Sequence, residues 1–256
     1  MRPLAGLYLL VAPCLALSQA GPETGAFRIT ETLAGIAGPD AARSVADVMP
    51  PDEPVTWEMY VPAHYDPARP PGLMVYISPT PSGGMPRGWN RVMDDHNLIW
   101  IAANRSGNSV IVGRRALFAQ LAPTVAGRRY ELDPERIYVT GLSGGGKMAS
   151  MVATEHANLF RGAIYNCGVE FWDRQTPRHI ELIRRNHYVF VTGTLDQALE
   201  PTRKAHRKYL DAGVANSKLM VIRDMTHRNP NRYNFAKAVA YLDERLQPAD
   251  DTAPEQ

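Results

Sequence analysis

The sequence predicts one α/β domain with a mostly parallel sheet and helices on both faces. Short apolar runs of strand length recur along the chain, and segments with helical spacing separate them. No internal repeat and no linker rich enough in Gly, Pro or Ser divides this alternation. Since a helical crossover joins parallel neighbours, the alternation indicates βαβ units.

Size and composition are those of an ordinary globular protein. The chain has 256 residues, of which 45% are hydrophobic and 21% charged, enough for one large α/β domain or two small ones. The formal net charge of +2 is too small to indicate nucleic acid or an acidic membrane surface as a partner. The aromatic residues are dispersed and do not alternate with basic ones, so we expect no nucleic-acid groove.

The N-terminus has the features of a secretory signal. After a basic start, residues 4–17 are mostly apolar and residues 18–20 are small at the two positions that a signal peptidase reads. We therefore expect residues 1–20 to be cleaved and the protein to be secreted or periplasmic. A retained anchor is disfavoured because the run is short and contains Pro13. A lipid anchor at Cys14 stays open.

Cleavage would leave Cys167 as the one cysteine. The mature domain would then have no internal disulfide, and its core must stabilise it. A single thiol excludes a cysteine-based metal cluster, and we expect no metal and no cofactor. Cys167 ends an apolar run and is interpreted as a small buried filler. No later run reaches 18 apolar residues, so we expect no stable membrane insertion.

The expected elements follow in chain order. Residues 21–51 are rich in Gly, Ala, Pro and Asp and predict an irregular lead-in with, at most, an edge strand at 27–32. The domain itself is expected over 52–246, and the Pro-rich, acidic tail 247–256 is expected to be disordered. Predicted strands are 55–61, which alternates, and the apolar runs 73–77, 98–103, 137–139, 161–166, 188–192 and 218–222. Predicted helices are 88–97, 112–126 (which Pro123 would shorten or kink), the segment after Ser143, 177–185, 201–212 and 235–246.

The stretch 136–150 organises the chain. An apolar strand leads into Gly141-Leu142-Ser143-Gly144-Gly145, and apolar residues then recur at helical spacing. G-x-S-x-G between a strand and a helix is the nucleophile elbow, which holds its serine in a strained turn. Glycine is expected at its two ends because a Cβ there would collide at the crossing of strand and helix.

Two other interpretations of this stretch were weighed. Glycine-rich turns can pack a helix on a strand with no catalytic role. Residues 141–147 also fit the phosphate-loop pattern G-x-x-x-x-G-K. A phosphate loop then needs Ser or Thr to hold magnesium, whereas this chain has Met148, whose thioether is a poor ligand for a hard cation.

A serine nucleophile needs a base and an orienting acid, which in a parallel sheet lie beyond the carboxyl ends of strands. Among seven histidines, only His227 falls in a loop just after the last predicted strand. Asp196 follows the preceding strand and is the first choice for the acid, with Asp173 as runner-up. Asp224 is interpreted as a turn-former near His227. The chain order Ser143, Asp196, His227 strengthens the prediction.

These segments resemble a known superfamily. Residues from about 52 to 245 resemble the α/β-hydrolase fold, and 133–149 resemble its polyhydroxyalkanoate-depolymerase and feruloyl-esterase branch. The resemblance implies Ser143 as nucleophile, His227 as base and Asp196 as acid. It also implies an oxyanion hole built from the Gly144 N–H and one N–H of the loop after Ile77.

The loop after Ile77 departs from the family pattern. The family usually has His-Gly there, whereas this chain has Ser78-Pro79. Proline has no N–H, so neither Pro79 nor Pro81 can donate. By position, Thr80 is the first choice for the second oxyanion donor and Ser82 the second.

The predicted function is hydrolysis of carboxylic esters through an acyl-enzyme. Between Cys167 and Tyr188 there is room for about one helix and no large cap domain. We therefore expect an open cleft for a small, bulky or polymeric ester, with Trp172 and Trp89 as candidate substrate-binding residues. A peptidase on the same fold and a catalytically inactive exported binding protein are the alternatives.

Overall fold

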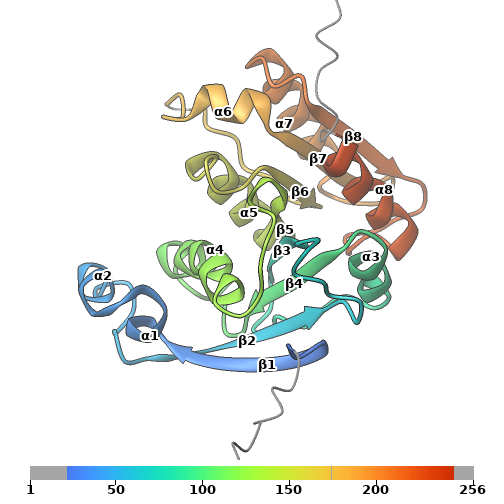
Figure 1. Cartoon of the computed structure of the whole chain (residues 1–256). Helices are drawn as coiled ribbons and strands as arrows, with labels where there is room; N and C mark the ends of the chain where they lie inside the picture. Colours follow the sequence, from blue (N-terminus) through green and yellow to red (C-terminus); the bar gives the residue numbers. More distant parts are fainter. Residues whose placement is uncertain (1–21, 174, 245–256) are drawn as a thin grey trace, which may run out of the picture.

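The computed structural model describes residues 22–173 and 175–244. The predicted signal peptide 1–20, Cys14 and the tail 247–256 lie outside the described residues. One eight-stranded sheet forms the centre, in the order β1-β2-β4-β3-β5-β6-β7-β8 (Figure 1). The pairs β1–β2 and β2–β4 are antiparallel, and all later pairs are parallel.

The strands are β1 (Gly25–Thr32), β2 (Pro54–Val61), β3 (Gly72–Ile77), β4 (Leu98–Ala103), β5 (Ile137–Leu142), β6 (Gly162–Asn166), β7 (His187–Gly193) and β8 (Ser217–Ile222). The helices are α1 (Leu33–Ala37), α2 (Pro39–Ser44), α3 (Trp89–Asp95), α4 (Val112–Gly127), α5 (Gly144–Glu155), α6 (Ile180–Arg185), α7 (Leu199–Asp211) and α8 (Arg232–Asp243). A short 3-10 turn, η1 (Pro134–Arg136), precedes β5.

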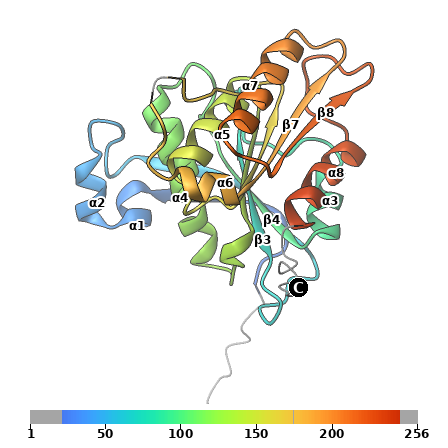
Figure 2. The same cartoon turned by 90° about the horizontal axis from the view of Figure 1, so that it is seen from above.

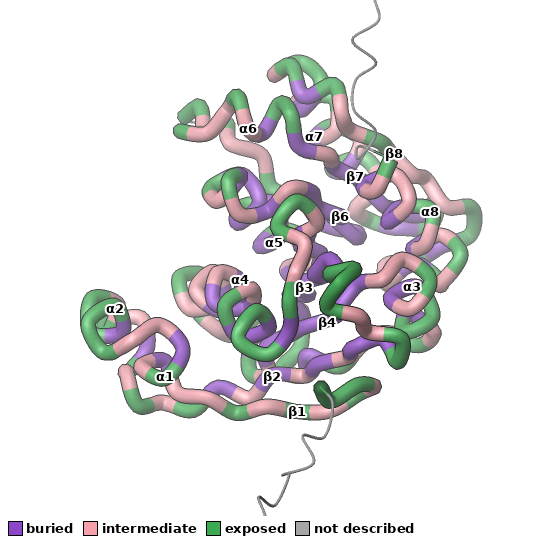
Figure 3. The backbone as a smooth tube through the Cα atoms, in the orientation of Figure 1, coloured by how far each residue is buried: buried purple, intermediate pink, exposed green. Residues whose placement is uncertain are grey.

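Helices cover both faces of the sheet, as predicted. In Figure 2, α3 and α8 lie on one side and the other helices on the opposite side. Strand β3 supplies both cores, because Leu73 and Val75 face one cluster while Met74 and Tyr76 face the other. The buried residues follow the central strands and the inner faces of the helices (Figure 3).

The prediction of an irregular lead-in over 21–51 is wrong, although its edge strand at 27–32 falls within β1. Strand β1 pairs with β2 along its whole length, from Gly25 opposite Val61 to Thr32 opposite Pro54. Helices α1 and α2 follow directly and contribute buried residues to the larger core. The pattern was hidden because β1 is a half-buried edge strand and the two helices have only five and six residues.

Helix α4 also differs from its prediction. It runs the full 16 residues from Val112 to Gly127, so Pro123 does not shorten it. Phe118, Ala122 and Val125 are buried against the sheet. This packing offsets the one backbone hydrogen bond that a proline inside a helix removes.

The topology determines where a site can form. Strand β3 lies between β4 and β5 in the sheet, so the direction in which successive strands are added reverses at this point. Ligands of open α/β sheets bind beyond the carboxyl ends of strands at such a point. Between β6 and β7 the described residues form one helix, α6, as expected for a chain without a large cap. No helix in the described part of the chain is long and apolar enough to span a membrane.

Candidate active site

Ser143 occupies the turn between β5 and α5. Its backbone has φ 56° and ψ −120°, in the left-handed region that residues with a Cβ rarely adopt. Such a conformation costs about 1–3 kcal/mol and persists only where the surroundings impose it. The Ser143 N–H donates to the Asn166 carbonyl at 2.8 Å, which fixes the turn against β6. This is the backbone geometry of a nucleophile elbow.

Glycine is required on the helix side of the elbow. A Cβ built on Gly145 would lie 1.9 Å from the carbonyl oxygen of Ile77, at the end of β3. A Cβ on Gly141 would lie 2.4 Å from the Gly145 backbone. These contacts press the start of α5 against the ends of β3 and β5. The elbow therefore lies where the topology predicts a ligand site.

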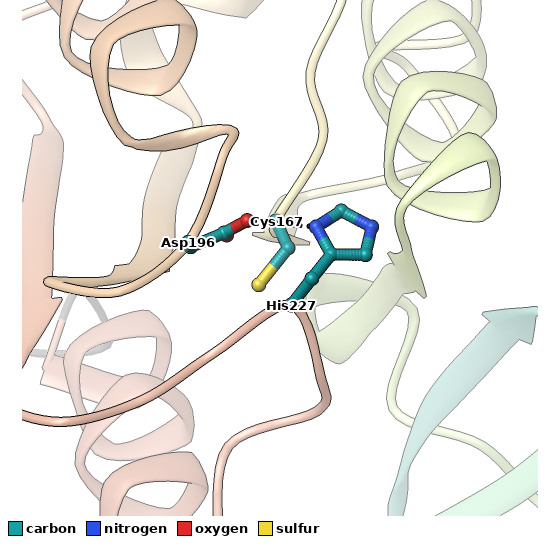
Figure 4. Close-up of side chains that lie close together, drawn as sticks. All are labelled: Cys167, Asp196 and His227. Carbon is teal, nitrogen blue, oxygen red and sulfur yellow. Dashed lines mark hydrogen bonds and ion pairs between the residues drawn. The ribbon is translucent and has the colours of Figure 1, made fainter.

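Asp196 and His227 lie next to each other. Nδ1 of His227 is 2.7 Å from Oδ1 of Asp196 (Figure 4). Their loops are tied by backbone bonds, since the Leu195 N–H donates to the Met225 carbonyl at 3.1 Å. In Figure 4 the second ring nitrogen of His227 is turned away from Asp196. One nitrogen is thus engaged by the acid, and the other is left for a second partner.

Asp196 is built to stay ionised. Its burial opposes the charged form, but hydrogen bonds from the Cys167 thiol, the Ala198 N–H, His227 and the Thr192 hydroxyl outweigh burial and hold the pKa of the carboxyl below its usual range. A carboxylate only accepts hydrogen bonds, so the proton of the shared bond belongs to Nδ1 of His227. In the neutral imidazole Nε2 is then the acceptor nitrogen, and a general base needs this tautomer.

Cys167 completes the polar cluster around this pair. It follows β6 with a φ of 53°, and its buried sulfur also lies 3.3 Å from the Arg228 carbonyl oxygen. Burial raises the pKa of the thiol far above its ordinary value, and the neighbouring Asp196 charge adds to this effect. The interpretation of Cys167 as an apolar filler therefore missed a contact to the acid. Cys167 directly follows a strand, as Asp196 does, and this position in the sequence could have indicated the contact.

The same three groups offer atoms of the kinds that bind metals. The sulfur, a carboxylate oxygen of Asp196 and a ring nitrogen of His227 all lie within 4.8 Å of one another (Figure 4). However, the carboxylate and the imidazole already bond each other, and the thiol is held in its protonated form. A metal at this cluster would therefore have to break the contact between Asp196 and His227 and displace the thiol proton.

Ser143 lies beside the cluster. A Cβ on Gly168, the residue after Cys167, would be 2.2 Å from the Ser143 carbonyl oxygen, so the two backbones are in contact. Within residues 22–173 and 175–244, no hydrogen bond joins the Ser143 hydroxyl to His227. Catalytic hydrogen bonds of this kind are often long without substrate. The transfer of the serine proton to His227 stays a prediction.

The two competing carboxylates lie away from the imidazole. Asp173, the runner-up for the acid, is exposed and pairs with Lys208 of α7. Asp224 has a φ of 55° and is exposed, its N–H donates to the Thr194 hydroxyl at 2.9 Å, and its carboxylate lies 3.5 Å from Arg223. The structure favours Asp196 over both, and Asp224 is the turn residue that was predicted.

The prediction for Thr80 requires correction. Its N–H donates to the hydroxyl of Ser78 at 3.1 Å, within the same loop. Ser78 is buried, so this bond closes the turn that the two prolines introduce. The Thr80 N–H is therefore engaged and does not point freely at a substrate. The Gly144 N–H, the first of α5, remains a candidate oxyanion donor because the first N–H groups of a helix have no intrahelical partner.

Trp89 is not a substrate-binding residue, and this prediction is wrong. It is the first residue of α3 and is fully buried. Its ring stacks on Phe235 of α8, and its indole N–H donates to the Pro230 carbonyl at 3.0 Å. Trp89 instead supports the loop that contains His227. Position near a strand end could not reveal this, because the stacking partner lies far along the chain.

Trp172 does line a cavity. It is half-buried, stacks on Phe171 at 4.3 Å between ring centroids, and forms part of the wall of a cavity of about 770 Å³ between α5 and residues 170–172 and 175–179. Met151 and Glu170 line the same cavity. Met151 lies eight residues after Ser143, about 12 Å along the helix axis. The cavity is thus within reach of the distant part of a substrate, and the role of Trp172 stays a prediction.

Known proteins support this fold assignment. A model of the prolyl oligopeptidase family matches residues 120–222, which include Ser143 and Asp196 and end before His227. Comparison with curated proteins finds no significant sequence match.

Solved structures that are similar to the chain include the following three. A thermostable esterase matches with 16% identity and a TM-score of 0.52 over 77% of this chain and 57% of its own. A ferulic acid esterase matches with 12% identity and a TM-score of 0.62 over 88% of this chain and 100% of its own. Dipeptidyl peptidase 4 from Porphyromonas gingivalis matches with 18% identity and a TM-score of 0.56 over 76% of this chain and 34% of its own.

The chain therefore spans little more than half of the thermostable esterase and about a third of the peptidase. The predicted resemblance in fold is confirmed by the strand order, the elbow after β5 and these structures. The chain has the α/β-hydrolase fold of esterases and peptidases, with a serine, an aspartate and a histidine after β5, β7 and β8.

Proposed function

We propose that the protein is an exported serine hydrolase that cleaves carboxylic esters through an acyl-enzyme on Ser143. The observation that supports it most is the 2.7 Å contact between His227 and the ionised Asp196, beside an elbow whose serine has a strained backbone. A serine becomes a nucleophile when a base of this kind accepts its proton.

The reaction would proceed in two halves. Nε2 of His227 takes the proton of Ser143 as its Oγ attacks the ester carbonyl, and the Gly144 N–H donates to the oxyanion. The tetrahedral intermediate collapses, and the imidazolium gives its proton to the departing alcohol. Water then attacks the acyl-enzyme with His227 as base and releases the acid, which restores Ser143. Asp196 holds the imidazole in place throughout.

The proposed substrate is a bulky or polymeric ester, of the polyhydroxyalkanoate or feruloyl type. Support comes from the stretch between β6 and β7, where the described residues form one helix and no large cover, and from the cavity beside Trp172. The stacked rings of Phe171 and Trp172 would offer an apolar platform to the acyl or alcohol part. No nucleic acid and no stable membrane insertion belong to this proposal.

A peptidase is the second candidate, because the matching family model is that of prolyl oligopeptidases. A peptidase that cleaves near the N-terminus of its substrate needs an acidic group that anchors the substrate amine. Glu170 on the cavity wall is half-exposed, but it lies 3.6 Å from Lys147, which compensates its charge.

Turnover of matched substrates tests the proposal. Short-chain p-nitrophenyl esters and peptide p-nitroanilides would be compared with wild type, Ser143→Ala and a control, Ser109→Ala, at an exposed loop serine. Ester cleavage lost only in Ser143→Ala supports the proposal. Preference for the anilides would make the protein a peptidase, and no turnover of either by folded protein would favour the inactive binding protein.

Export has its own test. Secreted protein would be collected from the medium or periplasm and sequenced from its N-terminus. The proposal expects a chain that begins at Gly21, after the small residues at 18–20. A mature chain that still begins at Met1 would contradict export by cleavage.

A further inference from the structure

The loop after β4 packs directly on the loop after β3. The Asn108 N–H donates to the Pro79 carbonyl at 2.9 Å, and the Arg105 N–H donates to the Pro81 carbonyl at 2.6 Å. A Cβ on Gly107 would lie 2.7 Å from the Thr80 backbone. The two loops therefore form one unit at the carboxyl end of the sheet, beside the start of α5.

A buried arginine holds this unit together. Arg115 of α4 is only 5% exposed, and its guanidinium donates to the Ser106 carbonyl at 2.7 Å and to the Ser78 carbonyl at 3.1 Å. No carboxylate in residues 22–173 and 175–244 pairs with it. A buried charge used only to bridge two loop carbonyls indicates that the relative position of these loops matters.

The side chain of Asn108 lies against the elbow. A Cβ built on Gly144 would be 2.2 Å from Oδ1, 2.7 Å from Cγ and 2.9 Å from Nδ2 of Asn108. The amide is thus within about 3.7 Å of the Gly144 Cα, since a carbon–carbon bond adds about 1.5 Å. Among the described residues the amide has no hydrogen-bond partner. An unengaged amide therefore lies beside the residue whose N–H begins α5.

The loop after β3 offers few backbone donors of its own. Two of its residues are prolines, the Thr80 N–H is bonded to Ser78, and the Gly83 N–H donates to the Asn104 side chain at 2.8 Å. Ser82, the second choice from the sequence, is exposed, and its N–H makes no hydrogen bond among the described residues, so it is the alternative donor in this loop. An oxyanion hole needs preorganised donors on the charge that develops in the transition state. The Gly144 N–H alone would be half of such a site.

We propose that the side-chain amide of Asn108 is the second oxyanion donor, beside the Gly144 N–H. The inference rests on the proposed function, because it assigns a residue to the same acyl transfer. The amide is exposed and turns about its Cβ–Cγ bond, so Nδ2 can face the site. Arg115 is then a positioning residue that holds the Asn108 loop at the elbow.

The test measures kcat and KM on a p-nitrophenyl ester for Asn108→Ala and Asn108→Asp, with Ser109→Ala as the control in the same loop. Losing one donor lowers kcat about 100- to 1000-fold and changes KM little. Asn108→Asp keeps the shape of the side chain but sets a carboxylate against the oxyanion, so kcat falls at least as far. Melting temperatures near that of the wild type show that both variants fold.

The outcomes separate this inference from the proposed function. Wild-type turnover that Ser143→Ala abolishes, with Asn108→Ala as fast as wild type, would overturn the role of Asn108 alone. An Asn108→Asp variant as active as wild type would also overturn it, because a packing role tolerates the isosteric change. A wild-type protein without turnover would contradict the proposed function itself.

Discussion

Asp196 accepts a hydrogen bond from Nδ1 of His227 at 2.7 Å, although 31 positions separate the two residues in the sequence. The contact exists because β7 and β8 are parallel neighbours, so the loops at their carboxyl ends leave the sheet side by side. Cys167, which follows β6, belongs to the same cluster, since its sulfur lies within 4.8 Å of the ligand atoms of Asp196 and His227. Three consecutive strands of the sheet thus supply the surroundings of one imidazole.

Asp196→Asn should lower kcat about 10⁴-fold. The amide would donate to Nδ1 and leave the imidazole in the wrong tautomer, with its geometry otherwise preserved. Steady-state kinetics on a p-nitrophenyl ester measure the effect. The control is Asp173→Asn, whose carboxylate is exposed and pairs with Lys208, and it should leave kcat unchanged. A large loss in Asp173→Asn alone would show that the acid is misassigned.

Asp243 should stabilise the fold in a pH-dependent way. It accepts hydrogen bonds from Arg136 and Tyr138, each at 3.0 Å, and contacts His96 at 2.9 Å. Burial opposes its charge, but the bonds from His96 and Arg136 outweigh burial and lower the pKa of the carboxyl. A lowered folded pKa means that the stabilisation is present above the unfolded value of about 3.9 and is lost as pH falls through the folded value.

Asp243→Asn should therefore lower the free energy of unfolding by about 2 kcal/mol at neutral pH. The deficit should shrink below about pH 4, where the wild-type carboxyl also becomes protonated. Urea unfolding at several pH values measures it. Asp211→Asn, at an exposed position that ends α7, is the control and should change little. A deficit that grows as pH falls would contradict the account.

Arg115→Met should affect both stability and turnover. It removes the donors to the Ser78 and Ser106 carbonyls, at a cost of about 2 kcal/mol in the free energy of unfolding. Because the Asn108 loop loses its anchor, kcat should fall while KM changes little. The neighbouring Arg114→Met breaks the ion pair with Glu53 instead and should leave kcat intact. Equal kcat losses in the two variants would indicate a general packing effect.

Cys167 should be inert in the folded protein. Thiol reagents attack the thiolate, and burial together with the Asp196 charge raises the pKa of this thiol. In a Cys14→Ser chain, an aromatic disulfide reagent should react with the thiol only after denaturation, and ester turnover should survive the treatment. Rapid labelling of native protein with loss of activity would contradict this environment.

The central strands could be predicted from the sequence because each is a continuous apolar run buried on both faces. The elbow and the positions of Asp196 and His227 followed from local patterns and the rule that sites gather at strand ends. Helices α1 and α2 could not be predicted, and strand β1 only in part, because their stability comes from pairing with β2 and from packing rather than from periodicity.

Loop contacts were the least predictable part. Trp89 was placed at a cleft but stacks inside on Phe235, 146 positions later. The Thr80 N–H was available by position, yet the Ser78 hydroxyl takes it. Asn108 was only a loop residue in the sequence, and its approach to Gly144 depends on how two loops pack on each other. Such contacts leave no trace in composition or spacing.

The most direct test of the account is covalent labelling of Ser143. Folded protein would be treated with a fluorophosphonate, which phosphonylates activated serines, and the labelled peptide would be identified by mass spectrometry. The account predicts one adduct, on the peptide that contains Ser143, with none in Ser143→Ala and much slower labelling in His227→Ala. Folded wild-type protein without an adduct, or with its adduct on another serine, would contradict it.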